Sequence, residues 1–250
     1  SIGFFADGKL KRVEVSGGPV TTLCDAFDSR GGTWSPRGVI LFTGAAQGAV
    51  SRVAAEGGAV TAATTLDKTL GESTHRYPSF LPDGVHFLYL ARRSGAGRGI
   101  EPTIYVGSLD SPDRTRVLVV ASNVVYASGS LLFVQQGVLV AQPFDPDKLT
   151  TRGPAVPLAE NVRMDERFSR GAFAASQNGM LVYLTGKAES RTQLRWLDRS
   201  GATQGSVGEA ADFTYGGLPE ISPDGRRAVM AILNPERGDS AIWVVDLDSG

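Results

Sequence analysis

A turn tetrapeptide recurs through the sequence at nearly constant spacing. Its final glycines lie at positions 38, 84, 129, 179 and 225, so that successive steps are 46, 45, 50 and 46 residues. A period of about 40–50 residues is that of one blade of a β-propeller. The five copies are SPRG, LPDG, a shorter ASG, SQNG and SPDG.

Each copy reads as a tight turn between two strands. Proline presets φ at the second position, Asp or Asn tolerates the left-handed region, and glycine takes the positive φ that closes the hairpin. An apolar stretch follows each turn, then a second one with an aromatic or branched centre, and then a weaker third. The first kind is VILFT, HFLYL, LLFV, MLVYL and RAVMAIL; the second is TIYVGSLD, VLVAQPFD, QLRWLD and AIWVVDLD; the third includes RVLVV and AVPLA.

These runs predict four antiparallel strands per repeat, A to D, with the turn joining A to B. One such sheet buries little by itself, so successive sheets must stack face to face. A β-sandwich is the alternative for many short strands, but it does not repeat its turn chemistry at this period. Residues 158–170 are the best helical candidate, although their charges leave no clean apolar stripe.

The predicted fold class is therefore an all-β propeller of four-stranded antiparallel blades. About six units are visible, and the first and last are incomplete, because the sequence opens at a B strand and reaches Gly250 where a D strand is expected. We predict a single propeller domain, or a fragment of one, over residues 1–250. Its units are approximately 1–27, 28–70, 71–122, 123–162, 163–212 and 213–250.

Charge and composition limit the partners. The sequence has 25 Lys and Arg against 26 Asp and Glu, so no global basic field attracts nucleic acid. No stretch approaches the ~20 apolar residues of a membrane helix, so no membrane insertion is expected within this segment. The single cysteine, Cys24, excludes an internal disulfide.

No catalytic, cofactor-binding or metal-binding residue is predicted. A G-x-S-x-G elbow, a phosphate loop and the Gly-rich, HRD and DFG signatures of kinases do not occur in the sequence. The D-x-D pairs at Asp145/Asp147 and Asp246/Asp248 lack the further ligands of a calcium loop and are interpreted as polar hairpin ends. We therefore expect these residues to form a non-enzyme without cofactors.

The arginine-rich stretch 92–102, RRSGAGRGIEP, is the most distinctive candidate for binding. It is the longest apparent B–C connection, and arginine forks suit carboxylate or phosphate groups. B–C and D–A loops emerge on one face of a propeller, so this stretch is expected to share a rim with arginines and a histidine from other loops. Interleaved acids favour a protein or peptide partner there, with a small ligand as the alternative. The predicted binding residues are His75, Arg76, Arg92, Arg93, Arg98 and Arg167.

The last repeat, SPDGRRAVMAILNPERGDSAIWVVDLDSG, resembles the TolB-type, WD-like propeller repeat. HRYPSFLPDGVHFLYL, LLFVQQGVLVAQPFD and LRWLDRSG are similar, more narrowly, to propellers that lie C-terminal to bacterial serine/threonine protein kinases. The resemblance covers essentially the whole sequence. It implies a sensory or protein-binding region, often outside the cytoplasm, with the kinase domain upstream. Two alternatives stay open: a TolB-like periplasmic scaffold, and a propeller lyase or hydrolase with its site at the channel mouth.

Overall fold

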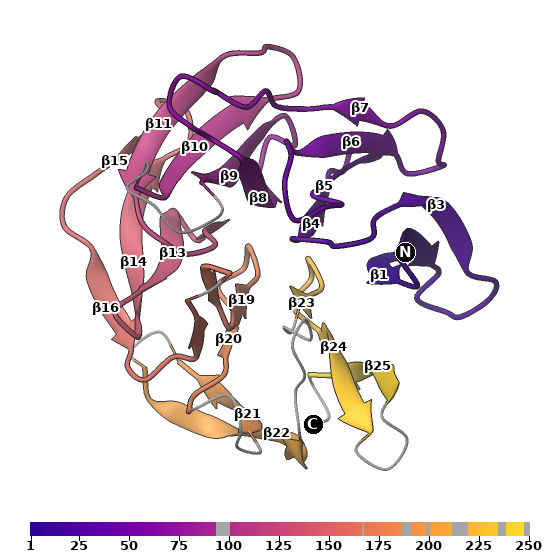
Figure 1. Cartoon of the computed structure of the whole chain (residues 1–250). Helices are drawn as coiled ribbons and strands as arrows, with labels where there is room; N and C mark the ends of the chain where they lie inside the picture. The colour runs from indigo at the N-terminus through magenta and orange to yellow at the C-terminus, as the bar shows by residue number, and fades with distance from the viewer. Residues whose placement is uncertain are drawn as a thin grey trace. The chain divides into compact units, whose positions relative to one another are not determined.

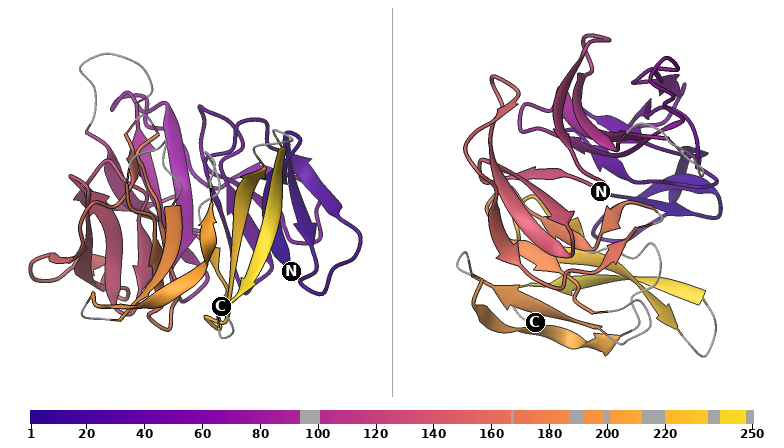
Figure 2. Two further views of the ribbon diagram at one scale, coloured as in Figure 1. Left: turned by 90° about the horizontal axis from the view of Figure 1, so that it is seen from below. Right: turned by 60° about the vertical axis from the view of Figure 1, so that its left-hand side comes forward.

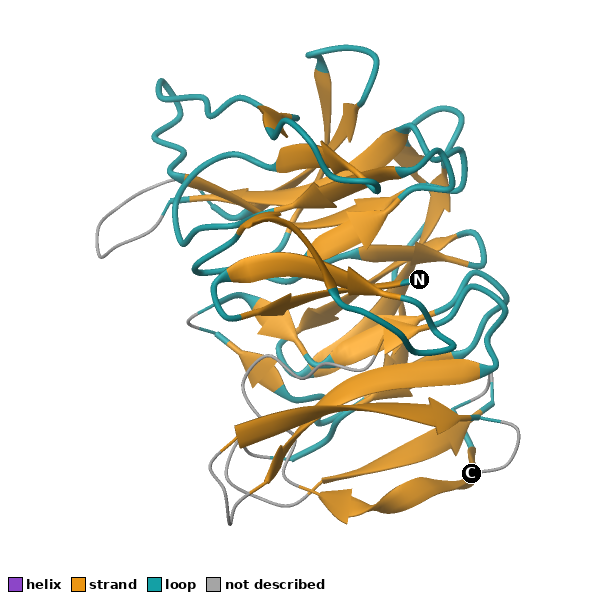
Figure 3. Ribbon diagram, turned by 90° about the vertical axis from the view of Figure 1, so that its right-hand side faces the viewer, coloured by secondary structure: helices purple, strands orange, loops and turns teal. Residues whose placement is uncertain are grey.

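The computed structural model describes residues 1–93, 101–166, 168–186, 192–198, 201–211, 220–234 and 239–247. Within these ranges the regular elements are all β-strands, joined by turns and loops without a helix (Figure 3). It follows that the described part of the chain contains no helix able to cross a membrane. The chain divides into two compact units, Ser1–Val124 and Val125–Gly250, which are described separately.

Unit 1 consists of three antiparallel sheets, which Figure 1 draws in indigo to magenta. The sheets have the strand orders β1-β2-β3, β4-β5-β6-β7 and β8-β9-β10-β11, so that neighbours in sequence are neighbours in the sheet. The strands are β1 Ile2–Ala6, β2 Lys9–Val13, β3 Thr21–Asp25, β4 Gly32–Trp34, β5 Val39–Phe42, β6 Ser51–Ala54, β7 Thr61–Ala62, β8 Thr74–Phe80, β9 His86–Arg92, β10 Thr103–Ser108 and β11 Arg114–Val119.

Unit 2 has the same meander with more irregular sheets, seen from two further directions in Figure 2. One sheet has the order β12-β13-β14-β15 with β16 also pairing β14; the pairs β17-β18, β19-β20 and β21-β22 follow, then β23-β24-β25. The strands are β12 Val125–Ala127, β13 Ser130–Gln135, β14 Val138–Asp145, β15 Thr150–Thr151, β16 Val156–Ala159, β17 Met164–Asp165, β18 Arg170–Gly171, β19 Phe173–Ala175, β20 Leu181–Tyr183, β21 Thr192–Leu197, β22 Thr203–Ala211, β23 Glu220–Ile221, β24 Arg227–Asn234 and β25 Asp239–Asp246.

The cores lie between consecutive sheets. In unit 1 one cluster joins the first sheet to the second through residues such as Leu10, Ile40 and Phe42. A second cluster joins the second sheet to the third through Leu41 and Phe87. Ile40 and Leu41 are adjacent residues of one strand, so their side chains point to opposite faces and each enters a different core. A sheet buried on both faces is what the stacking of blades requires.

The repeated turns take the backbone conformation that the sequence predicts. The final glycines at 38, 84, 129, 179 and 225 all have positive φ, between 66° and 92°. The aspartates were expected to tolerate the left-handed region, but Asp83 and Asp224 are not among the residues with positive φ. Instead their carboxylates accept backbone N–H groups from the start of the next strand: Asp83 from Val85 and His86, and Asp224 from Arg226.

Successive turns also contact each other. The Ser35 hydroxyl donates to the carbonyl of Gly84, at 2.8 Å, and a Cβ added at Gly84 would lie 2.9 Å from that hydroxyl oxygen. In unit 2 the Asn178 amide donates to the Asp224 carbonyl, at 3.1 Å. A Cβ at Gly225 would lie only 2.4 Å from the same amide nitrogen. At Gly84 and Gly225, close approach of the preceding turn therefore restricts the residue type in addition to φ, whereas a Cβ at Gly38 or Gly129 would meet nothing within 4 Å.

The all-β propeller prediction is confirmed. The blade number differs slightly: five blades are present in the described part of the chain, against about six predicted units. Residues 158–170, which lacked a clean apolar stripe, are not helical where the structure describes them: they form the end of β16, the short pair β17-β18 and turns.

Candidate functional site: a loop face over a buried ion network

Four connections of unit 1 are joined into one surface, which we call the loop face. It comprises residues 7–8, 26–31, 43–50 and 63–73, which link β1 to β2, β3 to β4, β5 to β6 and β7 to β8. Backbone hydrogen bonds join them in series: Ala26 N–H to Gly8 O at 2.8 Å, Asp28 N–H to Gly44 O at 3.0 Å, and Gly48 N–H to Ser73 O at 2.9 Å. Loops held in this way lose little conformational entropy when their side chains bind a partner.

Phe27 is the most exposed large apolar residue described, with 77% of its surface accessible. It is nevertheless held in place, because its ring covers Gly8 so closely that a Cβ there would lie 2.8 Å from Cδ1 of the ring. Lys9 lies beside it, with Nζ 5.9 Å from the ring centroid, and forms an ion pair with Asp25. A fixed aromatic ring next to charges of both signs has the composition of a protein-recognition surface.

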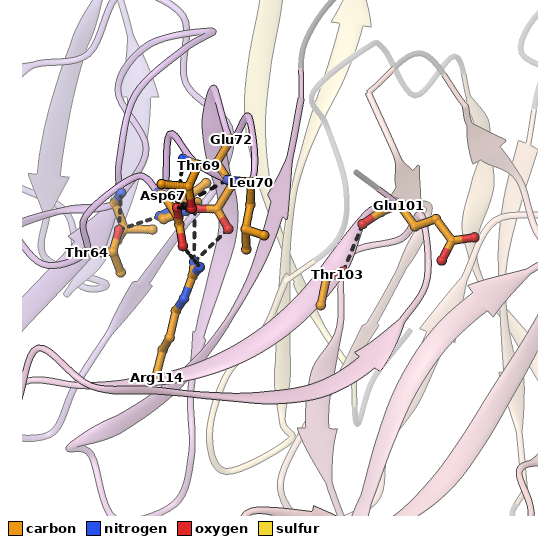
Figure 4. A network of polar contacts seen from close by, with 10 residues as sticks. Thr64, Asp67, Thr69, Leu70, Glu72, Glu101, Thr103 and Arg114 are labelled. Carbon is orange, nitrogen blue, oxygen red and sulfur yellow. Dashed lines mark hydrogen bonds and ion pairs between the residues drawn. The ribbon is translucent and has the colours of Figure 1, made fainter. Parts of the chain in front are cut away.

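A buried hydrogen-bond chain lies beneath the loop face, drawn in Figure 4. His75 is 0% exposed, and its Nδ1 is 2.7 Å from Oγ1 of Thr64. On its other side Nε2 is 3.0 Å from Oε2 of Glu72. Oε2 also accepts the backbone N–H of Asp67, at 2.7 Å. The connection 63–73 is thereby tied to strand β8 by buried side chains.

Arg114, on β11, completes this network from the outer strand of the third sheet. Its Nη1 donates to both oxygens of Glu72, at 2.7 and 3.0 Å, and its Nη2 to Asp67, at 3.4 Å. The guanidinium carbon also lies 4.1 Å from the ring centroid of Tyr105. Since Glu72 is buried, its charge depends on this partner, as buried carboxylates generally do.

The network fixes the protonation of His75. An ionised Glu72 requires a proton on Nε2, which leaves Nδ1 to accept the Thr64 hydroxyl proton. Burial lowers the pKa of His75, while the hydrogen bond and the charge of Glu72 act in the opposite direction. The imidazole is therefore neutral at pH 7. Burial also raises the pKa of the neighbouring Tyr89 to about 12, so its hydroxyl keeps its proton.

A hydroxyl, an imidazole and a carboxylate in series also occur in nucleophilic catalysis. Here the recess beside Thr64, lined also by Ser108 and Arg114, has a volume of about 20 Å³. That volume holds about one water molecule. In addition, the Thr64 oxygen accepts the N–H of Val50, at 2.9 Å. The arrangement acts as a structural tie between the loop face and the third sheet.

The predicted binding residues occupy different environments. His75 and Arg76 were expected on an exposed rim, but His75 is 0% and Arg76 4% exposed. Both support the loop at 43–50 from beneath: the His75 N–H donates to Gly48 O, at 2.9 Å, and Arg76 Nη2 to Ala46 O, at 3.0 Å. Arg92 is half-buried and Arg93 is exposed. Arg98 and Arg167 lie outside the described residues.

Two features of the site were missed at the sequence level. Phe27 was detectable in principle, since it is an aromatic residue between turn-forming residues. The pairing of Glu72 with Arg114 was not, because 42 positions separate the two residues. Within the described ranges, no group of three or more His, Cys, Asp or Glu side chains could hold a metal ion.

The chain is similar to known proteins in its structure. No family model matches the sequence, and no curated protein matches it. The fold is similar to that of TolB. The TolB of Acinetobacter baumannii is 17% identical, with a TM-score of 0.70 over 96% of this chain. This chain spans 57% of the length of that TolB chain.

Two further solved structures are similar. The gluconolactonase XC5397 of Xanthomonas campestris is 12% identical, with a TM-score of 0.64, over 95% of this chain and 78% of its own. A chain of the nidogen/laminin complex is 11% identical, with a TM-score of 0.57, over 97% of this chain and 91% of its own. At these identities the likeness establishes the propeller fold, which hosts both enzymes and binding proteins.

Proposed function

We propose that this chain is a non-catalytic propeller module that binds a protein or peptide partner on the loop face. The observation that carries the proposal is Phe27, a ring that is 77% exposed yet held against Gly8. Aromatic residues of this kind are the usual anchors of protein interfaces, and surrounding charges exclude wrong partners.

The test is selection of peptides from a random library on the purified chain, followed by affinity measurement. Phe27→Ala is expected to weaken the selected peptides at least tenfold, since an anchor contributes about 2 kcal/mol or more. The matched control is Val60→Ala, which shortens an apolar side chain that is 44% exposed outside the loop face. Failure to select any peptide, or equal affinity for the Phe27→Ala variant, would refute binding at this surface.

The enzyme alternative has its own outcome. A panel of lactone, ester and peptide substrates is expected to give no turnover above that of the His75→Gln variant. Turnover by the wild-type chain that this substitution abolishes would instead assign a catalytic role to the Thr64, His75 and Glu72 series. The control for folding is the circular dichroism of both proteins.

We further propose that the module is the sensor region of a bacterial serine/threonine protein kinase, on the extracytoplasmic side. Support comes from the resemblance of the stretches at 75–90, 131–145 and 194–201 to the propellers of such kinases. The second candidate is a TolB-like periplasmic scaffold, which the TM-score of 0.70 with TolB favours. The full reading frame separates them: kinase motifs and a membrane helix upstream support the first, and a signal peptide directly upstream supports the second.

A further inference from the structure

Three ion pairs lie around the exposed ring of Phe27. Each joins one aspartate to one basic side chain: Asp25 to Lys9, Asp7 to Lys11, and Asp28 to Arg30. The three aspartates lie within two residues of Phe27 or next to Gly8, which the ring covers. The formal charge of the six groups is zero, so their exposure decides which sign a partner meets.

In every pair the aspartate is the more exposed side chain. Asp7 is 82%, Asp25 60% and Asp28 49% accessible, whereas their basic partners are 18%, 39% and 15% accessible, in the same order. Each pair uses one oxygen of the carboxylate, and no residue in the described ranges donates to the second oxygen. These three aspartates, which we call the aspartate rim, therefore present acceptors to solvent around an apolar ring.

The Phe27 ring already contacts a cation. Lys9 Nζ lies 5.9 Å from the ring centroid, near the limit of about 6 Å for a cation–π contact. The same ammonium group binds Asp25, so one cation interacts with the ring and with a carboxylate together. An arginine suits such a position better than a lysine, because its planar guanidinium stacks on aromatic rings and binds carboxylates through several donors.

We propose that the partner segment bound at Phe27 is basic, and that one of its arginines stacks on the ring while the aspartate rim binds its positive charges. This inference rests on the proposed function and names the chemistry of the partner at that same surface. An acidic segment would meet the exposed carboxylates, and a second copy of this chain would set one aspartate rim against another. Like charges opposed in this way are unfavourable, so the charges favour a segment rich in arginine.

The experiment uses the 250-residue chain and two peptides capped at both ends, with the sequences GRLRGRLRG and GELEGELEG. Isothermal titration calorimetry at pH 7 and low salt measures both affinities. We expect the arginine peptide to bind about tenfold more tightly than the glutamate peptide, or more. Phe27→Leu should weaken the arginine peptide about two- to fivefold, since an exposed cation–π contact contributes about 0.5–1 kcal/mol.

Replacing the aspartate rim tests the charges separately from the ring. The triple variant Asp7→Asn/Asp25→Asn/Asp28→Asn keeps the size of the side chains, and asparagine tolerates the positive φ of 53° at position 7. It removes three negative charges, so we expect about tenfold weaker binding of the arginine peptide. The matched control, Glu56→Gln/Asp110→Asn/Asp147→Asn, removes the same charge at exposed positions outside the loop face and should bind as wild type.

Three results would overturn the inference: equal or tighter binding of the glutamate peptide, no binding of the arginine peptide, and unchanged affinity of the aspartate-rim variant. The peptides selected to test the proposed function separate the two proposals. If they depend on Phe27 but carry no excess of arginine and lysine, the proposed function stands and this inference alone is wrong. If no selected peptide depends on Phe27, both are wrong.

Discussion

Replacing Glu72 by alanine should destabilise unit 1 strongly, because three groups donate to its buried carboxylate. The side chain is 1% exposed and accepts from the Asp67 N–H, from His75 and twice from Arg114. Removing one partner of a buried ion pair typically costs 3–5 kcal/mol, roughly. The Arg114 side chain is 20% exposed and regains some hydration, so we expect the lower end, about 3 kcal/mol.

Urea unfolding at pH 7, followed by circular dichroism, measures this free energy. In a thermal scan the same loss corresponds to a decrease of about 6–12 °C in Tm for a chain of this size. Glu72→Gln should cost less, about 1.5–3 kcal/mol, because an amide oxygen can still accept from His75 and Asp67 while the charge-assisted bond to Arg114 is lost. The matched control is Glu56→Ala, at an exposed glutamate, with an expected change within about 0.5 kcal/mol.

A double-mutant cycle tests the reasoning directly. Glu72→Ala and Arg114→Leu together should cost less than the sum of the two single substitutions, by about 1–3 kcal/mol. Each single substitution leaves the other charge without its partner, whereas the double substitution removes both charges. Strict additivity, or a loss below about 1 kcal/mol for Glu72→Ala, would refute the view that this network ties the loop face to the third sheet.

Three further predictions concern buried groups. Burial lowers the pKa of His75 in the folded state, so the unfolded chain binds a proton at this histidine more readily. The free energy of unfolding should therefore fall as the pH decreases below the ordinary histidine value of 6.5. The Tm of His75→Gln should vary less than that of the wild type between about pH 7.5 and about 5. Equal pH dependence of the two proteins would contradict this. Gly107→Ala should cost about 1–3 kcal/mol in urea unfolding, because the added Cβ would lie 2.9 Å from the Phe87 ring, whereas Gly205→Ala, with its nearest contact at 3.9 Å, should be tolerated. Cys24, half-buried and with its pKa raised chiefly by burial, should react slowly with a thiol reagent at pH 8 and rapidly in urea; a fast reaction in the folded chain would show that the thiol is accessible.

The repeat period carried most of the information about the fold. The turn glycines could be located because a positive φ restricts the residue type so strongly that the requirement is visible in the sequence. The strands could be located because they lie between these turns. For example, VLVAQPFD was expected as a strand and is β14, over Val138–Asp145. A purely local requirement therefore sufficed to place each hairpin.

The site was less predictable because its contacts are not local. His75 lies in a stretch with no helical or strand signal strong enough to reveal burial. Its side-chain partners, Thr64 and Glu72, lie in the connection before β8, and Glu72 is bound in turn by Arg114 of β11. The sequence shows that an arginine and a glutamate exist but not that they meet across a sheet face. Residues assigned to binding for their charge, His75 and Arg76, were thus found supporting the loop at 43–50.

The contacts between successive turns have a consequence for how such a chain can grow. Ser35 binds the turn of the following sheet, and Asn178 does so in unit 2, so these two turns both close their own hairpins and bind the next turn. A duplicated segment that begins and ends at equivalent points of the repeat contains both a turn and the side chain that binds the next turn. An insertion that separates one turn from its neighbour breaks this contact between the two turns. Gene duplication in steps of a whole period is therefore the mode of lengthening that this architecture tolerates.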